Sequence, residues 1–169
     1  MKQLLLIFTF ATLATIIALV FVYFSANGQV QNTPIFPILR QLGMEKDKPV
    51  VKINDVKIYV DVAKTAEEQA RGLSNREKLG KNEGMLFVFK NKTYPGFWMK
   101  DMLFPIDIIW IADNKIVGIE KNVSPPEPVT RNAQLHLYKP PMGIDYVLEV
   151  NGGFCDSKKI NVGNIVKLP

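Results

Sequence analysis

The stretch VVKINDVKIYVDV, residues 50–62, sets the architecture of this chain. It contains two runs rich in β-branched residues, Val50–Ile53 and Val56–Val62, which the polar pair Asn54-Asp55 divides. Two polar turn residues between such runs indicate a β-hairpin. Apolar and polar side chains alternate along the second run, so one face of the hairpin is expected to pack against a core.

Beyond this hairpin, short apolar runs separated by turn residues predict further strands. Met85–Phe89 is too uniformly apolar for a half-exposed strand and is expected at the centre of a sheet. Thr65 and Glu68 match a capping box, which predicts a short helix running towards Leu73. The other predicted strands are Phe97–Lys100, Ile106–Ile111, Lys115–Val123, Tyr146–Val150 and Asn164–Leu168. This pattern indicates a mainly β domain over residues 49–169, a small sandwich or barrel with one short helix.

The N-terminus carries a hydrophobic segment, residues 4–24, whose 21 consecutive residues include no charge, Gly or Pro. A helix of this length covers about 30 Å, the hydrocarbon thickness of a bilayer. The segment is longer than the apolar core of about 7–15 residues in a cleaved signal peptide. Residues 1–26 are therefore predicted to form a transmembrane signal-anchor, and residues 27–48 are predicted to form a linker.

Charges flanking this segment predict its orientation. Lys2 precedes it, and no charge follows it before Arg40. The positive-inside rule then keeps the N-terminus in the cytoplasm. The expected location is the cell membrane, single-pass, with the C-terminal domain extracytoplasmic. Cleavage after Gly28, which would release the domain as a secreted protein, is the alternative.

The composition limits the classes of partner and cofactor. The chain has 169 residues, 47% hydrophobic and 22% charged, which suits one globular domain. The net charge of +5 is scattered and forms no basic motif, so nucleic acid is not an expected partner. The single cysteine, Cys155, excludes an intramolecular disulfide and is interpreted as a buried small hydrophobe, with a reactive thiol as the alternative. One Cys and one His do not supply a zinc site, and no calcium loop occurs, so neither metal nor cofactor is expected.

The candidate site centres on GFWMKDMLFPIDIIWI, residues 96–111, where charged residues interrupt an apolar, aromatic run. Burying such a charge is costly unless it is paired or used. The candidate ligand-binding residues are Arg71, Trp98, Lys100, Asp107 and Glu149. One interpretation is a structural salt bridge of Asp107 with Arg71 or Lys100. The other is a pocket in which Trp98 stacks on a sugar ring while the charged groups bind its hydroxyls.

Four stretches of the chain carry a family pattern. They are ARGL (70–73), GMLFVF (84–89), FWMKDMLFPIDIIWI (97–111) and VLEVNGG (147–153). In this order they resemble the motifs of the domain of unknown function 192 family, over about Val51–Leu168. The resemblance implies a compact, mainly β, jelly-roll-like domain of bacteria and archaea, often behind an N-terminal export segment. It implies no chemical role for any residue. This chain departs from the pattern at Ser74, where Met is usual, and at Asp101-Met102, where Asn-Thr is usual.

These features favour a membrane-anchored extracytoplasmic binding or accessory module, with a polar site around Asp107 for a small ligand such as a sugar. One alternative is an envelope hydrolase or lyase that uses Asp107 or Glu149 as acid or base. Another is a purely structural partner of a second envelope protein. Catalysis is the less favoured, because the chain lacks nucleophile-elbow, Walker and dinucleotide motifs and its single His136 lies in a proline-flanked loop.

Overall fold

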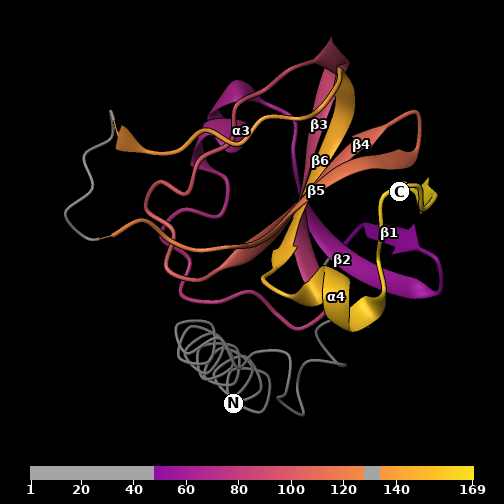
Figure 1. Cartoon of the computed structure of the whole chain (residues 1–169), viewed down its shortest axis with the longest axis horizontal. Coiled ribbons are helices and arrows are strands. Elements are labelled where there is room, and N and C mark those ends of the chain that lie inside the picture. The colour runs from indigo at the N-terminus through magenta and orange to yellow at the C-terminus, as the bar shows by residue number, and fades with distance from the viewer. Residues whose placement is uncertain (1–47, 128–133) are drawn as a thin grey trace, which may run out of the picture. The chain divides into compact units, whose positions relative to one another are not determined.

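A mixed sheet of seven strands forms the domain in the computed structural model, which describes residues 48–127 and 134–169 (Figure 1). In order across the sheet, the strands are β5 (Lys115–Val123), β4 (Ile106–Ala112), β6 (Ile144–Asn151), β3 (Glu83–Thr93), β2 (Val56–Ala63), β1 (Val50–Ile53) and β7 (Val166–Lys167). Neighbouring strands are antiparallel, except for β2 and β3, which are parallel. The predicted hairpin is present as β1 and β2, and β3 lies at the centre of the sheet, as its apolar run predicted.

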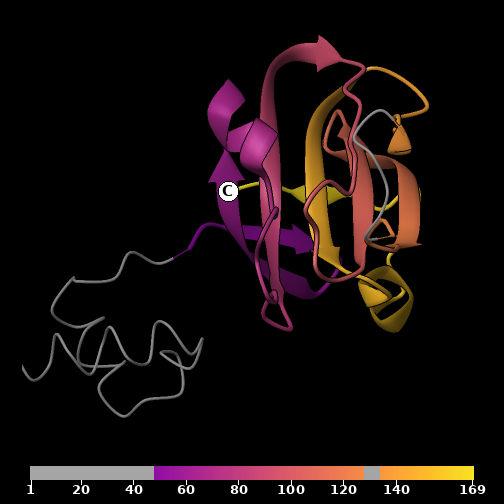
Figure 2. The ribbon, with the colours of Figure 1, turned by 90° about the vertical axis from the view of Figure 1, so that its left-hand side faces the viewer.

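The sheet curls into a half-barrel (Figure 2). Its two outermost strands approach each other at the C-terminal segment. Here β7 pairs with β1, while the adjacent Ile165 forms a bridge with Lys115 at the start of β5. The backbone N–H of Val166 also donates to the carbonyl of Asn114 at 2.8 Å. The predicted sandwich is therefore wrong, and the predicted barrel is present only as a half-barrel.

Two hydrophobic clusters cover the two faces of this sheet. The cluster on the inner face includes Val51, Ile58, Leu86, Ile109, Ile116, Leu148, Val150, Phe154 and Cys155. The cluster on the outer face includes Leu73, Met85, Phe87, Met99, Met102, Ile108, Trp110 and Val147. Because both faces of β4 are covered, every residue of that strand is buried.

Within the described residues, two short helices accompany the sheet, where the sequence predicted one for the domain. The capping box of α3 (Ala66–Arg71) is confirmed: Thr65 Oγ1 accepts from the Glu68 N–H at 3.2 Å, and Glu68 Oε2 accepts from the Thr65 N–H at 2.9 Å. The helix ends at Gly72, whose φ of 48° suits glycine. The second helix, α4 (Phe154–Lys158), follows β6 directly, and the two helices lie towards opposite ends of the sheet (Figure 1).

The strand predicted at Phe97–Lys100 is wrong. In this stretch, Phe97 alone makes a bridge, with Tyr138, through two hydrogen bonds of 2.9 and 2.8 Å. Its ring packs edge-to-face on Phe87 at 4.8 Å and on Trp110 at 5.5 Å. Aromatic packing onto the outer face of the sheet, rather than strand pairing, therefore fixes this segment.

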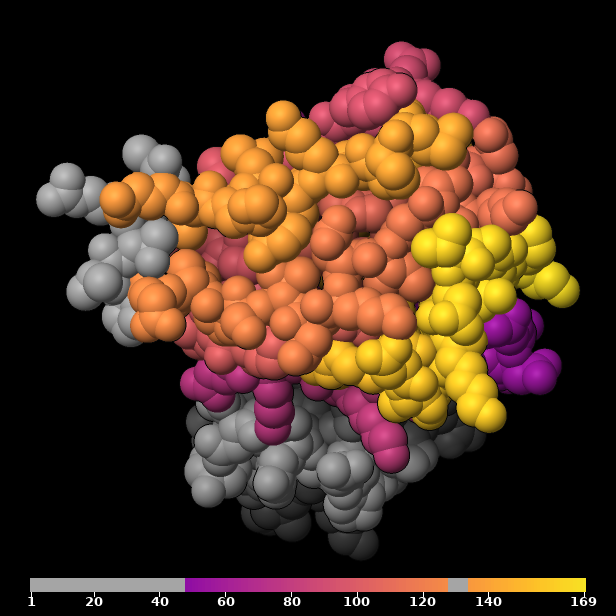
Figure 3. Space-filling view, viewed as in Figure 1, coloured from indigo at the N-terminus to yellow at the C-terminus, as the bar shows by residue number. Residues whose placement is uncertain are grey.

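The segment 134–142 lies on the surface of the domain beside β5 (Figure 3). A Cβ on Gly118 of β5 would lie 3.1 Å from Pro141 Cδ, so the two backbones are close. His136 is exposed in this segment, and its ring packs edge-to-face on Tyr138 at 4.5 Å. The histidine therefore lies in a surface loop, as the sequence predicted.

The predicted signal-anchor and nearly all of the linker lie outside the described residues. Within residues 48–127 and 134–169, no helix has the length and apolar character that crossing a membrane requires.

Replacing Gly84 by alanine is expected to destabilise the sheet. An added Cβ would lie 2.7 Å from the carbonyl oxygen of Glu149 and 3.2 Å from Leu148 Cδ1, so β3 and β6 would have to separate. Overpacking of this kind costs about 1–3 kcal/mol. Chemical unfolding of the full chain in detergent micelles measures the loss. The matched control is Gly143→Ala, whose Cβ would lie 3.5 Å from Tyr94 Cε2, an ordinary contact. Equal stabilities of the two variants would contradict the prediction.

Candidate functional site

The structure separates the five candidate residues. Arg71, Trp98 and Glu149 line one pocket on the outer face of the sheet. Asp107 is fully buried on the inner face, and Lys100 does not line the pocket. The predicted polar cluster around Asp107 is therefore wrong, and so is its predicted salt bridge with Arg71 or Lys100.

The carboxylate of Asp107 accepts hydrogen bonds from three backbone N–H groups. Oδ1 accepts from Asn122 at 2.7 Å and from Gly153 at 3.0 Å, and Oδ2 accepts from Cys155 at 2.7 Å. These contacts compensate for the burial of the carboxylate, and the positive charge of Lys121 also acts on it. Burial, together with the negative charge of Asp107, raises the pKa of the Cys155 thiol, so this cysteine is an inert core residue.

Two local features leave the three N–H groups that donate to Asp107 without a backbone acceptor. The pairing of β4 and β5 shifts register between Ile106 and Ile108, and this β-bulge places Asn122 at a φ of 49°. The N–H groups of Gly153 and Cys155 belong to the start of α4, where no helical acceptor exists. Asp107 therefore acts as a cap that ties α4 to the bulge.

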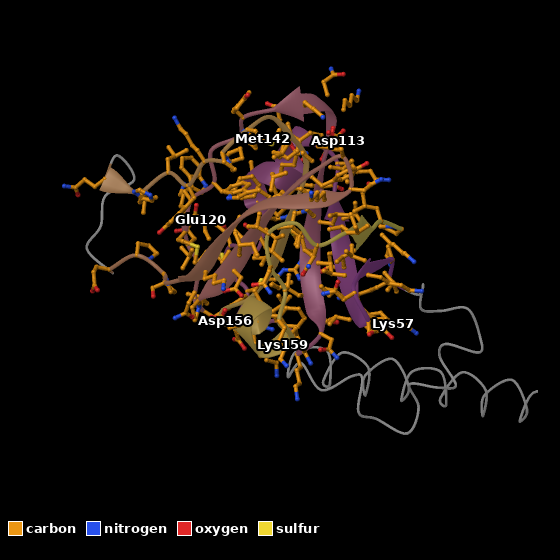
Figure 4. The ribbon with its side chains drawn as sticks, turned by 45° about the vertical axis from the view of Figure 1, so that its right-hand side comes forward. Lys57, Asp113, Glu120, Met142, Asp156 and Lys159 are labelled. Atoms are coloured by element: carbon orange, nitrogen blue, oxygen red, sulfur yellow. The ribbon has the colours of Figure 1, made fainter. Side chains whose placement is uncertain are left out.

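The exposed side of α4 carries an ion pair. Lys121 Nζ donates to Asp156 Oδ1 at 2.6 Å. In Figure 4, Asp156 and Lys159 mark the α4 end of the domain, and Asp113 and Met142 mark the opposite end. Asp107 therefore caps α4 on its buried side, and the Lys121–Asp156 ion pair lies on the exposed side of the same helix.

The pocket on the outer face has a volume of about 240 Å³. It forms where the end of α3, strand β3, the segment 95–98 and strand β6 meet. Its lining residues are Gln69, Ala70, Arg71, Gly72, Leu73, Ser74, Phe87, Phe89, Pro95, Gly96, Phe97, Trp98, Met102 and Glu149. All four stretches that carry the family resemblance thus contribute to one pocket.

Hydrogen bonds within the protein occupy two of the four polar side chains in this lining. Gln69 Nε2 donates to the carbonyl of Val88 at 2.9 Å, and Ser74 Oγ donates to the carbonyl of Lys100 at 2.9 Å. In the part of the chain that the structure describes, the side chains of Arg71 and Glu149 make no hydrogen bond or salt bridge. These two side chains are therefore the ones left to bind a ligand.

Glu149 lies on the floor of the pocket and is only 5% exposed. It belongs to β6, between Met85 of β3 and Ile108 of β4. Burial raises the pKa of Glu149 to about 8, although the positive charge of Arg76 acts in the opposite direction. At neutral pH this carboxyl is mainly protonated, and it can donate as well as accept a hydrogen bond.

The mouth of the pocket is aromatic and positively charged. Trp98 is 47% exposed, and Arg71 is exposed at the end of α3. The Lys100-Asp101 turn supports the wall through its backbone, since the carbonyl of Asp101 also accepts from Asn75 at 2.7 Å. Lys100 therefore positions the wall through its main chain.

Sequence reasoning missed Arg76. Its guanidinium donates to Asp61 Oδ2 at 2.7 Å, and Lys48 Nζ lies 3.2 Å from Asp61 Oδ1 and 3.1 Å from Glu83 Oε1. Burial opposes the ionisation of Asp61, but hydrogen bonds and charges from Arg76 and Lys48 outweigh it and lower the pKa of that carboxyl. This network joins β2, β3 and the turn after α3, so no local pattern in the sequence signals it.

Metal ligation has no support in residues 48–127 and 134–169, where no three His, Cys, Asp or Glu side chains are placed to hold an ion. The chemistry that the described pocket offers is hydrogen bonding through one neutral carboxyl and one guanidinium, beside aromatic surfaces.

Comparisons with known proteins agree with this fold. A crystal structure of a protein of unknown function from Novosphingobium aromaticivorans DSM 12444 is similar, with 28% identity and a TM-score of 0.63, over 70% of this chain and 83% of that one. A protein from Sinorhizobium meliloti 1021, provisionally described as a transcription regulator, is 23% identical with a TM-score of 0.63, over 73% of this chain and 97% of that one. A comparison with curated proteins finds no match.

A family profile covers almost the whole described domain. The profile of the DUF192 family, described as an uncharacterised ACR, matches residues 49–168. The resemblance predicted from the four motifs is confirmed. The chain belongs to the domain of unknown function 192 family.

Proposed function

We propose that this protein is a membrane-anchored, extracytoplasmic binding module, and that its domain binds a small ligand such as a sugar in the pocket lined by Arg71, Trp98 and Glu149. One observation carries the binding proposal. A buried carboxyl without a protein partner faces a pocket that has an exposed tryptophan and a free guanidinium at its mouth. A few polar groups converging on an apolar concave surface are typical of a ligand site.

The size of the pocket supports a small ligand. Its volume of about 240 Å³ is below the range of about 300–1,000 Å³ that is usual for drug-sized molecules. A single sugar ring, or one unit of a longer glycan, suits this volume. The apolar face of the ring would stack on Trp98, and its hydroxyls would bind Arg71 and Glu149.

Binding is better supported than hydrolysis. Two-carboxylate mechanisms place a pair of Asp or Glu residues around the scissile bond. Among the described lining residues, Glu149 is the only carboxyl, and Asp107 lies on the other face of the sheet. The raised pKa of Glu149 suits a general acid. Product analysis after incubation with oligosaccharides tests this second candidate.

The proposed location rests on residues 4–24 and their flanking charge. A fusion of alkaline phosphatase to the C-terminus is expected to be active, since that enzyme matures only outside the cytoplasm. An active cytoplasmic reporter at the same position, with an inactive phosphatase, would overturn the orientation.

Replacing Trp98 by alanine is expected to abolish sugar binding and leave the fold intact, because this side chain is 47% exposed at the mouth of the pocket. The measurement is thermal unfolding of the full chain in detergent with glucose, galactose, N-acetylglucosamine or glucuronate. A ligand at ten times its Kd stabilises by about 1.4 kcal/mol. Tyr94→Ala is the control, since Tyr94 is 69% exposed and lies outside the pocket lining. A panel in which no sugar raises the midpoint contradicts the sugar proposal.

A further inference from the structure

We infer that the pocket selects an acidic sugar, a hexuronic acid, whose carboxylate pairs with Arg71 and whose hydroxyl accepts a hydrogen bond from the neutral carboxyl of Glu149. This inference rests on the proposed function, because it names the ligand class of the same pocket. Three features of the lining carry it: the charge at the rim, the state of the carboxyl on the floor, and the aromatic surface at the mouth.

The charge at the rim favours an anionic group. Arg71 is the only cationic side chain among the described lining residues, and it is exposed. Its guanidinium forms no hydrogen bond or salt bridge with another residue of the described ranges, although its charge also acts on Glu68. A guanidinium presents a planar pair of donors that matches a carboxylate in a bidentate arrangement. A ligand carboxylate therefore has a free partner at this position.

The floor of the pocket favours an uncharged polar group. Glu149 is flanked by the apolar side chains of Met85 and Ile108 in the neighbouring strands, and ionising it there removes a charge from water. The positive charge of Arg76 favours ionisation of Glu149, and Arg71 lies at the rim of the same pocket. Burial still dominates and raises the pKa of Glu149 to about 8. A neutral carboxyl donates one hydrogen bond and accepts another, as a sugar hydroxyl does.

A cationic ligand fits less well. An ammonium on the floor would require Glu149 to ionise between two apolar side chains, and the same ligand would approach the positive charge of Arg71. With Trp98 exposed at the mouth to cover the ring, a uronic acid satisfies all three features together.

A pair of matched ligands tests the inference. Methyl β-D-glucuronide and methyl β-D-glucoside differ only in the carboxylate, and calorimetry on the full chain in detergent gives both affinities. At pH 6 the glucuronide is expected to bind at least about tenfold more tightly, because its carboxylate adds a charge-assisted hydrogen bond with Arg71. Arg71→Gln is expected to remove this preference. Lys57→Gln is the control and is expected to keep it, because Lys57 is an exposed lysine of β2 outside the pocket lining.

The pH dependence tests the neutral form of Glu149. If only that form binds, the affinity for the glucuronide falls about tenfold between pH 7 and pH 9, in proportion to the neutral fraction. Glu149→Gln keeps a donor and an acceptor, so its affinity is expected to stay level over this range. An affinity that rises with pH overturns the inference. Equal binding of both glycosides also overturns it but leaves the binding function standing. Failure of both glycosides and of the wider sugar panel overturns both proposals.

Discussion

Replacing Asp107 by alanine is expected to lower the free energy of unfolding by about 3–5 kcal/mol. The change leaves three backbone N–H groups without their acceptor, the part-buried groups of Asn122 and Gly153 and the buried group of Cys155. Each orphaned donor costs about 1–3 kcal/mol, and the three costs do not add fully because the site can relax. Urea unfolding of the full chain in detergent, followed by circular dichroism, measures the loss.

Two companion variants make this result specific. Asp107→Asn keeps one side-chain oxygen as an acceptor, but its amide NH₂ replaces the other oxygen and faces at least one backbone N–H donor. An intermediate loss of about 1–3 kcal/mol is therefore expected. Asp156→Ala removes an exposed carboxylate at the same end of the domain, and because its pair with Lys121 is exposed to solvent, the loss of that pair is expected to change the stability little. If Asp107→Ala is no less stable than Asp156→Ala, the capping role is wrong.

The local elements of the domain could be predicted because their signals are local. The hairpin of β1 and β2 follows from two β-branched runs around Asn54-Asp55, and the capping box at Thr65 lies within four residues. The apolar run of β3 predicted a central strand for the same reason, since a strand covered on both faces has no polar alternation.

The composition of the site could not be predicted, because it depends on strand register. Asp107 pairs with Val150, and Glu149 pairs with Ile108. The two carboxyls thus occupy neighbouring rows of one ladder and point to opposite faces of the sheet. A shift of one residue would have placed them together, and the sequence of either strand is compatible with both registers. Grouping them around Asp107 failed for this reason.

Helix α4 was missed because its cap is remote. A helix of five residues has no periodicity to detect, and its N-cap, Gly153, has no side chain to accept a hydrogen bond. The acceptor is Asp107, 46 residues earlier in the chain. An acidic residue inside an otherwise apolar strand was the available signal, and it was interpreted as an ion pair or a ligand group.

Raising the pH from 5 to 9 is expected to destabilise the wild-type protein more than Glu149→Gln. The pKa of Glu149 is about 8 in the folded domain, against 4.5 for an ordinary glutamate. Between these values the folded state holds a proton that the unfolded state has lost, so stability decreases as the pH rises. The contribution is fully present below about pH 4.5 and is lost as the pH passes 8. Its size is at most about 5 kcal/mol, from 1.36 kcal/mol per pKa unit.

Glutamine has the shape of the neutral glutamate and carries no titrating proton, so the stability difference between the two proteins isolates Glu149. Chemical unfolding at several pH values gives both curves, which are expected to diverge steadily above pH 5, with the variant the more stable at pH 9. Glu120→Gln is the matched control, because Glu120 lies on β5 outside the pocket, and its curve is expected to follow the wild type. Parallel curves for wild type and Glu149→Gln would show that water or a charge reaches this carboxyl. The neutral donor on which the proposed hydroxyl contact depends would then not exist.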